Sequence, residues 1–451
     1  MFSYTYRNMA LFRTFAKHPR GLWILGLTEL CERFAFWGVG NLLVLYLLEY
    51  YQFSGVKATH IYGLLSGCAA FLPLFGGLLA DRWSYQKLLF LGAFCNLIGC
   101  LLLSSGIPFF LYPSLVIIAG GFGIFTPSVV ALLGELYEGK ESIREAGFSI
   151  YYASINVGVF LALFSLGIIA KTVSWNAAFL VAAFVQGLGL LPIIWYFRKF
   201  KTSHQKTKEP LKNLHLPKTP LTGGERRRVF AISIFCLLSI FFWTVYNQAF
   251  SSMSIFAHSF MNKTISGYNI PEGVFLSTES FFLVLLAPLL ASLYGWLQKK
   301  KKNPSVALKT LYSFFFIALG FFIMVIATRS IPSGALTASV SSSYLVGAYF
   351  AIAVSEMLLA PISLSMVSLL APRKLKGFLI GLWYVCVGIA YYIGGLLAGL
   401  IETTAKLDHF FGLFIIIALI PAAFLILFHK KLTHILRRDP GEIDSTPHIP
   451  R

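Results

Sequence analysis

Charged residues are scarce in this chain of 451 residues. Aspartate, glutamate, lysine and arginine make up 12% of it, against roughly 25% in soluble domains. Only 18 residues are acidic, and hydrophobic residues supply 57% of the chain. Apolar stretches of about 20 residues recur, and each is long enough to cross about 30 Å of hydrocarbon. This composition excludes an ordinary soluble domain and predicts an all-α polytopic membrane protein.

Patterns typical of catalytic and metal sites are also missing. The chain has no His-Glu-x-x-His and no Gly-x-Ser-x-Gly sequence, and its nine histidines lie in loops, tails or span edges. We therefore expect no enzyme, no metal site and no cofactor. The cysteines lie in apolar stretches without zinc-ligand or redox spacing, so we expect packing residues and no disulfide. They are Cys31, Cys68, Cys95, Cys100, Cys236 and Cys386.

The hydrophobic pattern predicts twelve membrane spans. Between the sixth and the seventh lies 198–228, a polar linker with ten lysines and arginines. It separates a bundle in 1–197 from a second bundle and a tail in 229–451, with six spans in each. The expected spans are 21–50, 58–80, 86–105, 109–134, 145–170, 175–197, 229–257, 272–298, 306–328, 345–371, 377–402 and 407–429.

The net charge of +19 reflects topology rather than nucleic-acid binding. With both termini in the cytoplasm, the inner segments hold 31 of the 37 lysines and arginines, the outer loops hold five, and Arg33 is the remainder. The positive-inside rule therefore predicts cytoplasmic termini. Residues 1–20 carry four basic residues but no separate short apolar core, so we expect the first span to be retained rather than cleaved as a signal.

Six plus six spans with both ends inside is the plan of a major facilitator, in which two bundles rock about a site at mid-membrane depth. The loop after the second span runs Gly76-Gly77-Leu-Leu-Ala-Asp81-Arg82 and resembles the loop signature of that superfamily. The resemblance implies the major facilitator fold, with twelve transmembrane helices in two six-helix bundles.

Three charges stand inside the first predicted span. Glu29, Glu32 and Arg33 are spaced i, i+3 and i+4, so they share one helix face. Each charge at mid-bilayer costs about 2.5–3.5 kcal/mol on insertion scales, so the three persist only if they pair or face a watery cavity. Glu279 in the eighth span and Glu356 in the tenth are the other carboxyls well inside spans.

These five residues form the candidate set for proton coupling. The protonation of a buried carboxyl depends on its arginine neighbour, so a glutamate whose arginine partner can leave is a candidate proton carrier. The alternative is a static ion pair that holds helices together.

Several segments resemble the proton-dependent oligopeptide transporter family. Glu29-x-x-Glu32-Arg33-Phe34-x-Phe36-Trp37-Gly38 is similar to its first-helix signature, although tyrosines are usual where Phe36 and Trp37 stand. Other segments match in the family's order along nearly the whole chain. They are Ala146–Gly158 in the fifth span, Phe242–Ser252 in the seventh, Ser355–Pro361 in the tenth and Gly381–Trp383 in the eleventh.

The resemblance implies roles for particular side chains. Arg33 is expected to bind the peptide carboxylate or to pair with Glu29 or Glu32, and Glu356 to face the peptide amine. Asn156 is expected to hydrogen-bond the peptide backbone, and Trp383 to line a side-chain pocket near Tyr151 and Tyr152. The residues expected to bind substrate are Arg33, Phe36, Trp37, Thr126, Asn156, Asn247, Glu279, Glu356 and Trp383.

The chain also departs from the family pattern. Thr126 replaces a lysine before Pro127, and Asn247 replaces an acidic residue before Gln248. Losing both charges together is coherent, because losing one would strand a buried charge at a cost of about 3–5 kcal/mol. Glu279 stands where an asparagine is usual, and Ala70 where a tyrosine is common. These changes leave the expected cavity one unit more negative, which disfavours acidic cargo.

Two transport hypotheses follow. The first is a proton-coupled symporter that imports di- and tripeptides or similar peptide-like solutes by alternating access. The alternative is a divergent relative that carries amino acids, amines or modified peptides with altered or loosened coupling. A membrane-embedded enzyme is disfavoured, because Arg33 would keep a Glu29–Glu32 dyad ionised. We expect a multi-pass plasma-membrane monomer (bacterial inner membrane if bacterial) whose partners are a small peptide substrate, protons and lipid, without nucleic acid.

Overall fold

A computed structural model describes most of the chain. The described residues are 18–80, 83–137, 141–199, 221–300, 302, 304–370, 372 and 375–436. Asp81 and Arg82 of the loop signature, residues 200–220 of the expected linker, and Arg373 and Lys374 lie outside this part. Twelve helices among the described residues are long and apolar enough to cross a membrane, which confirms the expected number of spans.

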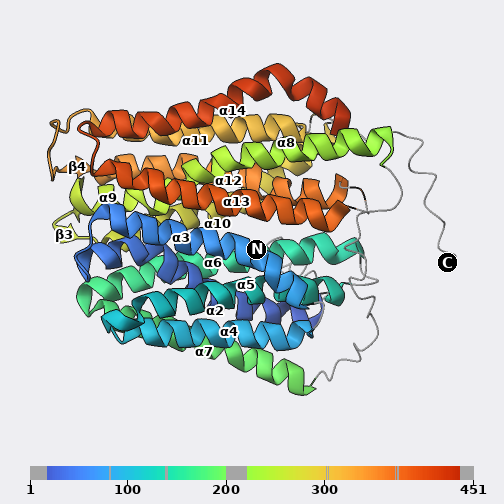
Figure 1. Cartoon of the computed structure of the whole chain (residues 1–451), viewed down its shortest axis with the longest axis horizontal. Helices are drawn as coiled ribbons and strands as arrows, with labels where there is room; N and C mark the ends of the chain where they lie inside the picture. Colours follow the sequence, from blue (N-terminus) through green and yellow to red (C-terminus); the bar gives the residue numbers. More distant parts are fainter. Residues whose placement is uncertain are drawn as a thin grey trace, which may run out of the picture. The chain divides into compact units, whose positions relative to one another are not determined.

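The helices begin and end within a few residues of the predicted spans (Figure 1). Among the helix starts the largest difference is at α8, which begins at Gly223 rather than at 229 because a capping box between Thr222 and Glu225 starts the helix earlier. Among the ends, α14 continues to Leu436 rather than stopping at 429. The helices are α2 (Arg20–Glu49), α3 (Gly55–Ala80), α4 (Tyr85–Ser104), α5 (Leu111–Leu136), α6 (Glu141–Thr172), α7 (Trp175–Lys199), α8 (Gly223–Tyr246), α9 (Ser252–Ser259), α10 (Glu272–Lys299), α11 (Val306–Thr328), α12 (Ser342–Leu370), α13 (Lys376–Ala398) and α14 (Leu407–Leu436).

The chain groups into two units that do not simply follow the two halves of the sequence. Unit 1 contains the described residues within 1–51, 71–210 and 270–284, and unit 2 contains those within 52–70, 211–269 and 285–451. Two helices are therefore divided: the first part of α3 groups with unit 2, and the first part of α10 groups with unit 1.

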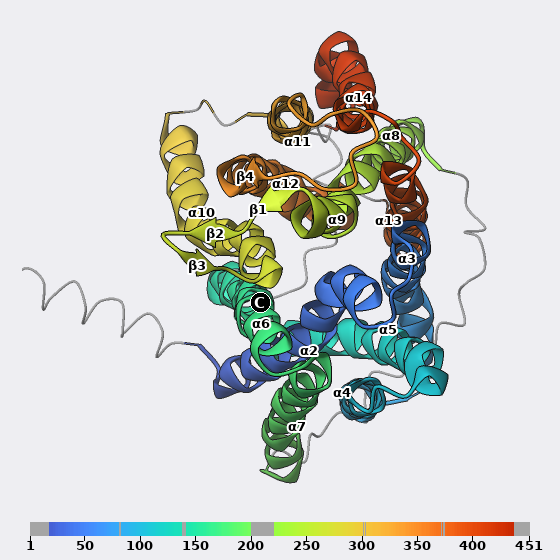
Figure 2. The ribbon, with the colours of Figure 1, turned by 90° about the vertical axis from the view of Figure 1, so that its left-hand side faces the viewer.

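Helix α2 is the central element of unit 1. It packs against α4, α5, α6 and α7, and Figure 2 shows it lying among them. Its side chains from Thr28 to Phe36 are nearly all buried. Over this stretch α2 has almost no exposed surface, so its charged residues must find partners inside the unit.

Unit 2 is built around α8, which packs against α13 and α14, while α11 packs against α12 and α14. Short strands join its loops: β1 (Met261–Asn262) pairs in parallel with β4 (Val340–Ser341), and β2 (Thr264–Ile265) pairs antiparallel with β3 (Tyr268–Asn269). The backbone N–H groups of Gly55 and Val56, which start α3, donate to the Glu402 carboxylate. The first N–H groups of a helix have no partner within the helix, and this carboxylate accepts hydrogen bonds from two of them.

Both divided helices approach their unit through glycine pairs. In unit 2, a Cβ added to Gly63 of α3 would lie 2.8 Å from the Cα of Gly395 in α13. In unit 1, a Cβ added to Gly167 of α6 would lie 2.7 Å from the Cα of Gly273 in α10. Small residues let helix backbones come this close, which is a common way to pack helices in membranes.

The seventh predicted span is interrupted, although the sequence predicted one continuous helix. Helix α8 ends at Tyr246, a 3₁₀ turn covers Asn247–Phe250, and α9 follows. The Ser251 hydroxyl donates to the Asn247 carbonyl at 2.7 Å. Serine side chains that bond nearby backbone groups compete with the helical ladder, and a 3₁₀ stretch within a helix often marks a functional hinge.

Many large apolar side chains face outward. Val116 is 71% exposed, Phe184 65% and Leu427 76%. A soluble monomer rarely exposes apolar surface on this scale. These faces fit contact with lipid tails, in agreement with a multi-pass membrane protein.

Candidate functional site

The predicted charged face of α2 forms a buried ion cluster in unit 1. Arg33 Nε donates to Glu29 Oε1 at 2.6 Å, one turn away on the same helix. Arg33 Nη1 lies 3.2 Å from Glu32 Oε2, an ion pair without the alignment of a hydrogen bond. Both glutamates are fully buried and Arg33 is 4% exposed. Of the two arrangements that the sequence left open, mutual pairing or a watery cavity, the structure shows the pairing.

Two other helices contribute hydrogen bonds to this cluster. Thr126 of α5 accepts a hydrogen bond from Arg33 Nη2 at 3.3 Å. Asn96 of α4 donates through Nδ2 to Glu32 Oε1 at 2.8 Å. Two carboxylates and one guanidinium carry a net charge of −1 when all are ionised, so one added proton would neutralise the cluster.

An aromatic group covers Arg33 on one side. The Phe122 ring of α5 has the Arg33 guanidinium carbon 4.6 Å from its centroid, a cation–π arrangement. The same ring lies 4.0 Å from Phe36 and 5.9 Å from Trp37, centroid to centroid. Phe36 is buried and Trp37 is half-buried. The two aromatic residues expected to bind substrate thus lie beside the ion cluster.

Helix α6 faces this cluster with the segment that resembles the fifth-helix signature. Tyr151 is buried and close enough to interact electrostatically with Glu29, Glu32 and Arg33. Asn156 is 8% exposed, and its amide donates to the Tyr152 carbonyl of its own helix at 3.2 Å. The amide oxygen of Asn156 therefore stays available for a ligand.

Glu279 groups with unit 1 through the first part of α10. It is 1% exposed, and the Ser280 hydroxyl donates to its carboxylate at 3.1 Å. The α10 segment meets α6 through Phe281, whose ring centroid lies 5.7 Å from that of Phe160. Glu279 is thus a carboxyl buried in the part of α10 that packs with unit 1.

Unit 2 holds the other expected site residues. At the break after α8, Gln248 donates to the Gly394 carbonyl of α13 at 2.9 Å, and Asn247 donates to the Ser66 hydroxyl of α3 at 3.5 Å. Both amides are buried. Asn247, which replaces the family's acidic residue, is therefore part of a neutral hydrogen-bond network.

Two further residues of unit 2 were expected to bind substrate. Glu356 lies on α12 and is 8% exposed. Trp383 lies on α13, half-buried, with its ring 5.0 Å from that of Tyr384. The Trp383 indole N–H has no hydrogen-bond partner among the described residues. It is a donor available to a ligand.

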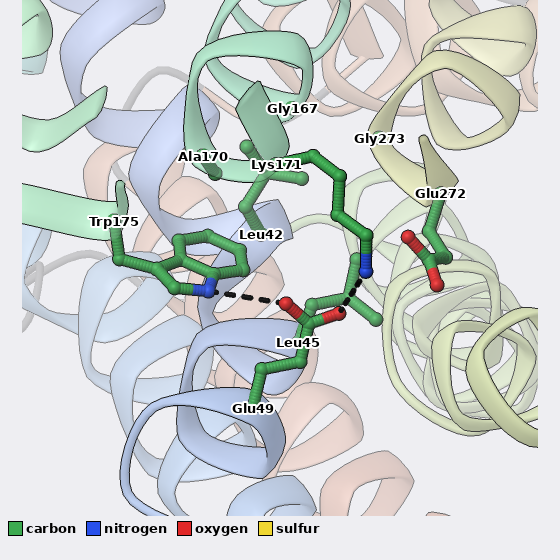
Figure 3. Close-up of a pocket in the computed structure, with 9 residues that line it drawn as sticks. All are labelled: Leu42, Leu45, Glu49, Gly167, Ala170, Lys171, Trp175, Glu272 and Gly273. Carbon is green, nitrogen blue, oxygen red and sulfur yellow. Dashed lines mark hydrogen bonds and ion pairs between the residues drawn. The ribbon is translucent and has the colours of Figure 1, made fainter. Parts of the chain in front are cut away.

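A second charged cluster lines a pocket at the end of α2 (Figure 3). Glu49 accepts a hydrogen bond from Trp175 Nε1 at 3.2 Å and lies 3.8 Å from Lys171 Nζ. A carboxylate oxygen of Glu272 lies within 4.8 Å of one of Glu49. The Lys171 side chain is 45% exposed, so solvent screens this cluster far more than the Arg33 cluster.

Sequence reasoning did not single out several of these residues. Glu272 was grouped with residues near span ends, yet it is 3% exposed. Asn96 and Phe122 contact the ion cluster from other helices and were not identified. The signals were present: Asn96 is a lone amide in an apolar span, and Phe122 lies in the run Gly120-Gly121-Phe122-Gly123.

Comparisons with known proteins agree with this architecture. The model of the Major Facilitator Superfamily matches residues 25–354. The peptide transporter YePEPT of Yersinia enterocolitica is 27% identical, over 88% of this chain and 90% of the relative. Dipeptide and tripeptide permease A of Proteus mirabilis is 26% identical, over 85% of this chain and 87% of the relative.

Solved structures share the fold. A mutant of the peptide transporter POT in complex with alafosfalin superposes with a TM-score of 0.82 at 24% identity, covering 93% of this chain and 96% of that one. A POT family transporter in complex with 5-aminolevulinic acid gives a TM-score of 0.80 at 23% identity, covering 92% and 97%.

Proposed function

The chain belongs to the Major Facilitator Superfamily, and from this premise we propose that it is a member of the proton-dependent oligopeptide transporter family and a proton-coupled symporter of di- and tripeptides or similar peptide-like solutes. The two relatives described above are named as peptide transporters, which supports this cargo. Alternating access about a central site is the general mechanism of the fold.

The observation that carries the proposal is the buried Glu29–Glu32–Arg33 cluster. One guanidinium serves two carboxylates in a site sealed from water. Burying unbalanced charge is costly, so protonation of one carboxyl relieves the cluster. Arg33 can then turn part of its guanidinium toward the substrate carboxylate. Proton uptake and substrate binding become linked through a shared arginine.

Residues of unit 2 also have proposed roles in substrate binding. We assign Glu356 to the substrate amine, because an ionised carboxylate attracts an ammonium group, and the Trp383 indole N–H to a side-chain or backbone oxygen. Asn156 of unit 1 would bind the peptide backbone through its amide oxygen. Glu279 is retained as a further carboxyl for proton coupling.

Purified protein in liposomes tests the proposal. With an inside-alkaline pH gradient, labelled dipeptide should accumulate in the lumen, and a trapped pH dye should report acidification in step with uptake. The control is the same preparation with the gradient collapsed by a protonophore. If uptake does not respond to the pH gradient and the luminal pH does not change, the proposed proton coupling is wrong.

A divergent cargo remains the second candidate, favoured by two uncharged side chains, Thr126 in unit 1 and Asn247 in unit 2. Thr126 bonds to Arg33 and Asn247 to Ser66, so neither position offers the charge usual in the family, while Glu279 adds an anion. Competition of labelled dipeptide uptake by amino acids, polyamines and modified peptides separates the two candidates. Stronger competition by single amino acids or polyamines than by dipeptides would favour the second.

We infer that the protein works as a monomer in the plasma membrane, with cytoplasmic termini. The excess of lysine and arginine in the expected inner segments supports this orientation. Protease digestion of right-side-out vesicles tests it, because tags at both termini should resist cleavage until the membrane is opened.

A further inference from the structure

Asn96 is a buried amide in an otherwise apolar stretch of α4. It has no exposed surface, and Nδ2 donates to Glu32 Oε1 at 2.8 Å. A buried polar side chain is costly unless it has a hydrogen-bond partner. The partner here is a carboxyl group of the ion cluster, so the amide and Glu32 belong to one site.

The other end of the Asn96 amide is unused. Oδ1 is buried and has no hydrogen-bond partner among the described residues, and it points toward Gly121 of α5. An amide offers a donor at one end and an acceptor at the other, and a half-turn about χ2 exchanges them. Asn96 can therefore donate to Glu32 when it is a carboxylate and accept the O–H when it is a carboxylic acid.

Glu29 has a different environment. Its main partner is Arg33 Nε at 2.6 Å, and a guanidinium has donors but no acceptor. This partner satisfies a carboxylate and offers nothing to the O–H of a carboxylic acid. The Tyr151 hydroxyl of α6 is the other neighbour of Glu29, but it makes no hydrogen bond to Glu29 in this structure. The Arg33 contact to Glu32 is longer, 3.2 Å, and is not aligned as a hydrogen bond. The two carboxyls of the motif are therefore not equivalent.

We propose that Asn96 is a positioning residue that makes Glu32, rather than Glu29, the carboxyl that takes up the transported proton. The inference rests on the proposed proton-coupled transport. One proton binds Glu32 Oε1, the amide turns to accept it, and the cluster loses one negative charge. Glu29 keeps Arg33 Nε, and Arg33 Nη1 is released from Glu32 toward an incoming carboxylate.

Other titratable groups face Glu32 from the surrounding helices. They are Glu29 and Arg33 on its own helix, Cys100 on α4 and Tyr151 on α6. Helix α5 contributes the neutral Thr126 hydroxyl, which reaches Arg33. Tyr151 approaches the cluster on the Glu29 side, so Asn96 is the amide that faces Glu32.

The test compares three variants in liposomes. Asn96→Leu removes both the donor and the acceptor at similar volume, and Asn96→Thr restores a group that can do both. The matched control is Gln186→Leu, which removes another buried amide that bonds to α4, at the Ala93 carbonyl, 3.0 Å away. Each variant is measured for gradient-driven uptake from pH 5 to 8 and for counterflow, which needs no net proton movement.

We expect Asn96→Leu to lower gradient-driven uptake about tenfold or more, the effect of losing a hydrogen bond to a charged group, and to change its pH profile. Counterflow should fall much less. Asn96→Thr should recover part of the profile, and Gln186→Leu should keep the wild-type profile. In a Glu32→Gln background, Asn96→Leu should change the profile no further, whereas in a Glu29→Gln background it should.

The outcomes separate this inference from the proposed function. If the wild type shows no gradient-driven uptake, the proposed function fails. If the wild type is proton-driven and Asn96→Leu keeps its pH profile, or acts equally in both glutamate backgrounds, the inference is overturned.

Infrared difference spectroscopy gives an independent readout that needs folded protein but no transport. A carboxylic acid band that appears on acidification should vanish in Glu32→Gln, persist in Glu29→Gln and shift in Asn96→Thr. A band that vanishes in Glu29→Gln and persists in Glu32→Gln would overturn the proposal.

Discussion

Unit 1 buries opposite charges at its centre, whereas unit 2 buries neutral amides and hydroxyls at its helix break. In unit 1, the cation of Arg33 faces two carboxylates of α2. Thr126 of α5 and Asn96 of α4 add neutral hydrogen bonds to Arg33 and Glu32. Around Gln248, backbone carbonyls and serines satisfy amides whose charge never changes. The difference teaches that a proton can alter the charge of the first network, while the second can respond only by changing its geometry.

The largest effect should come from removing the shared cation. Arg33→Met leaves two buried carboxylates without a counter-charge, and breaking a buried pair costs about 3–5 kcal/mol. We expect gradient-driven uptake to be lost and the melting temperature in detergent to fall. Arg33→Lys keeps the charge but not the planar fork, so it should restore stability better than uptake. A stable, active Arg33→Met protein would contradict the role of the cluster.

The neutral network of unit 2 should affect stability without affecting the pH dependence of uptake. Gln248→Leu removes donors to the Gly394 carbonyl and the acceptor of Ser252, so we expect about 1–3 kcal/mol of destabilisation. The pH profile of the remaining uptake should stay unchanged, because no titrating group is involved. Thermal unfolding and a pH series measure both effects. A shifted pH profile would contradict the proposal that protons act on the network of unit 1 and not on that of unit 2.

The glycine pairs should be equally important in both units. Gly63→Ala in unit 2 and Gly167→Ala in unit 1 each force a Cβ against a facing Cα, which should cost about 1–3 kcal/mol by overpacking. Gly412→Ala and Gly120→Ala are the matched controls, since an added Cβ there meets no atom within 4 Å. Thermal unfolding of all four variants compares them. Equal stability of tests and controls would contradict the close packing.

The smallest effect should come from the open cluster at the end of α2. Lys171→Gln removes an ion pair with Glu49 at 3.8 Å, with the lysine 45% exposed. Exposed pairs contribute less than about 1 kcal/mol and weaken with salt. We expect a small fall in melting temperature that disappears at high salt. A loss as large as that of Arg33→Met would show that this cluster is as important as the buried one.

The sequence predicted the elements that depend on local order. Hydrophobic stretches gave the twelve spans, and the spacing of Glu29, Glu32 and Arg33 gave a shared helix face with an Arg33–Glu29 pair. The break after Tyr246 was not predicted, because Phe242–Ser252 is apolar and aromatic enough to be read as one helix. What interrupts it are hydrogen bonds of Asn247, Gln248 and Ser251 that depend on neighbouring helices as well as on local order.

The candidate site shows the same limit. Its residues on α2 could be identified from one helix, but Asn96 and Phe122 reach the cluster from α4 and α5, more than sixty residues away along the chain. Glu272 is a further example: its place near a span end gave no reason to expect burial, and packing buried it. Burial depends on neighbours that periodicity does not identify.

The sequence by itself determined the membrane class, the number of spans and the charged face of the first helix, because hydrophobicity and the 3.6-residue period act over a few turns. The tertiary structure alone decided which carboxyl accepts the hydrogen bond of the Asn96 amide. It also decided where α3 and α10 are divided between the units and which charges are buried. Those outcomes depend on distances between helices, and such distances follow from side-chain packing across the fold.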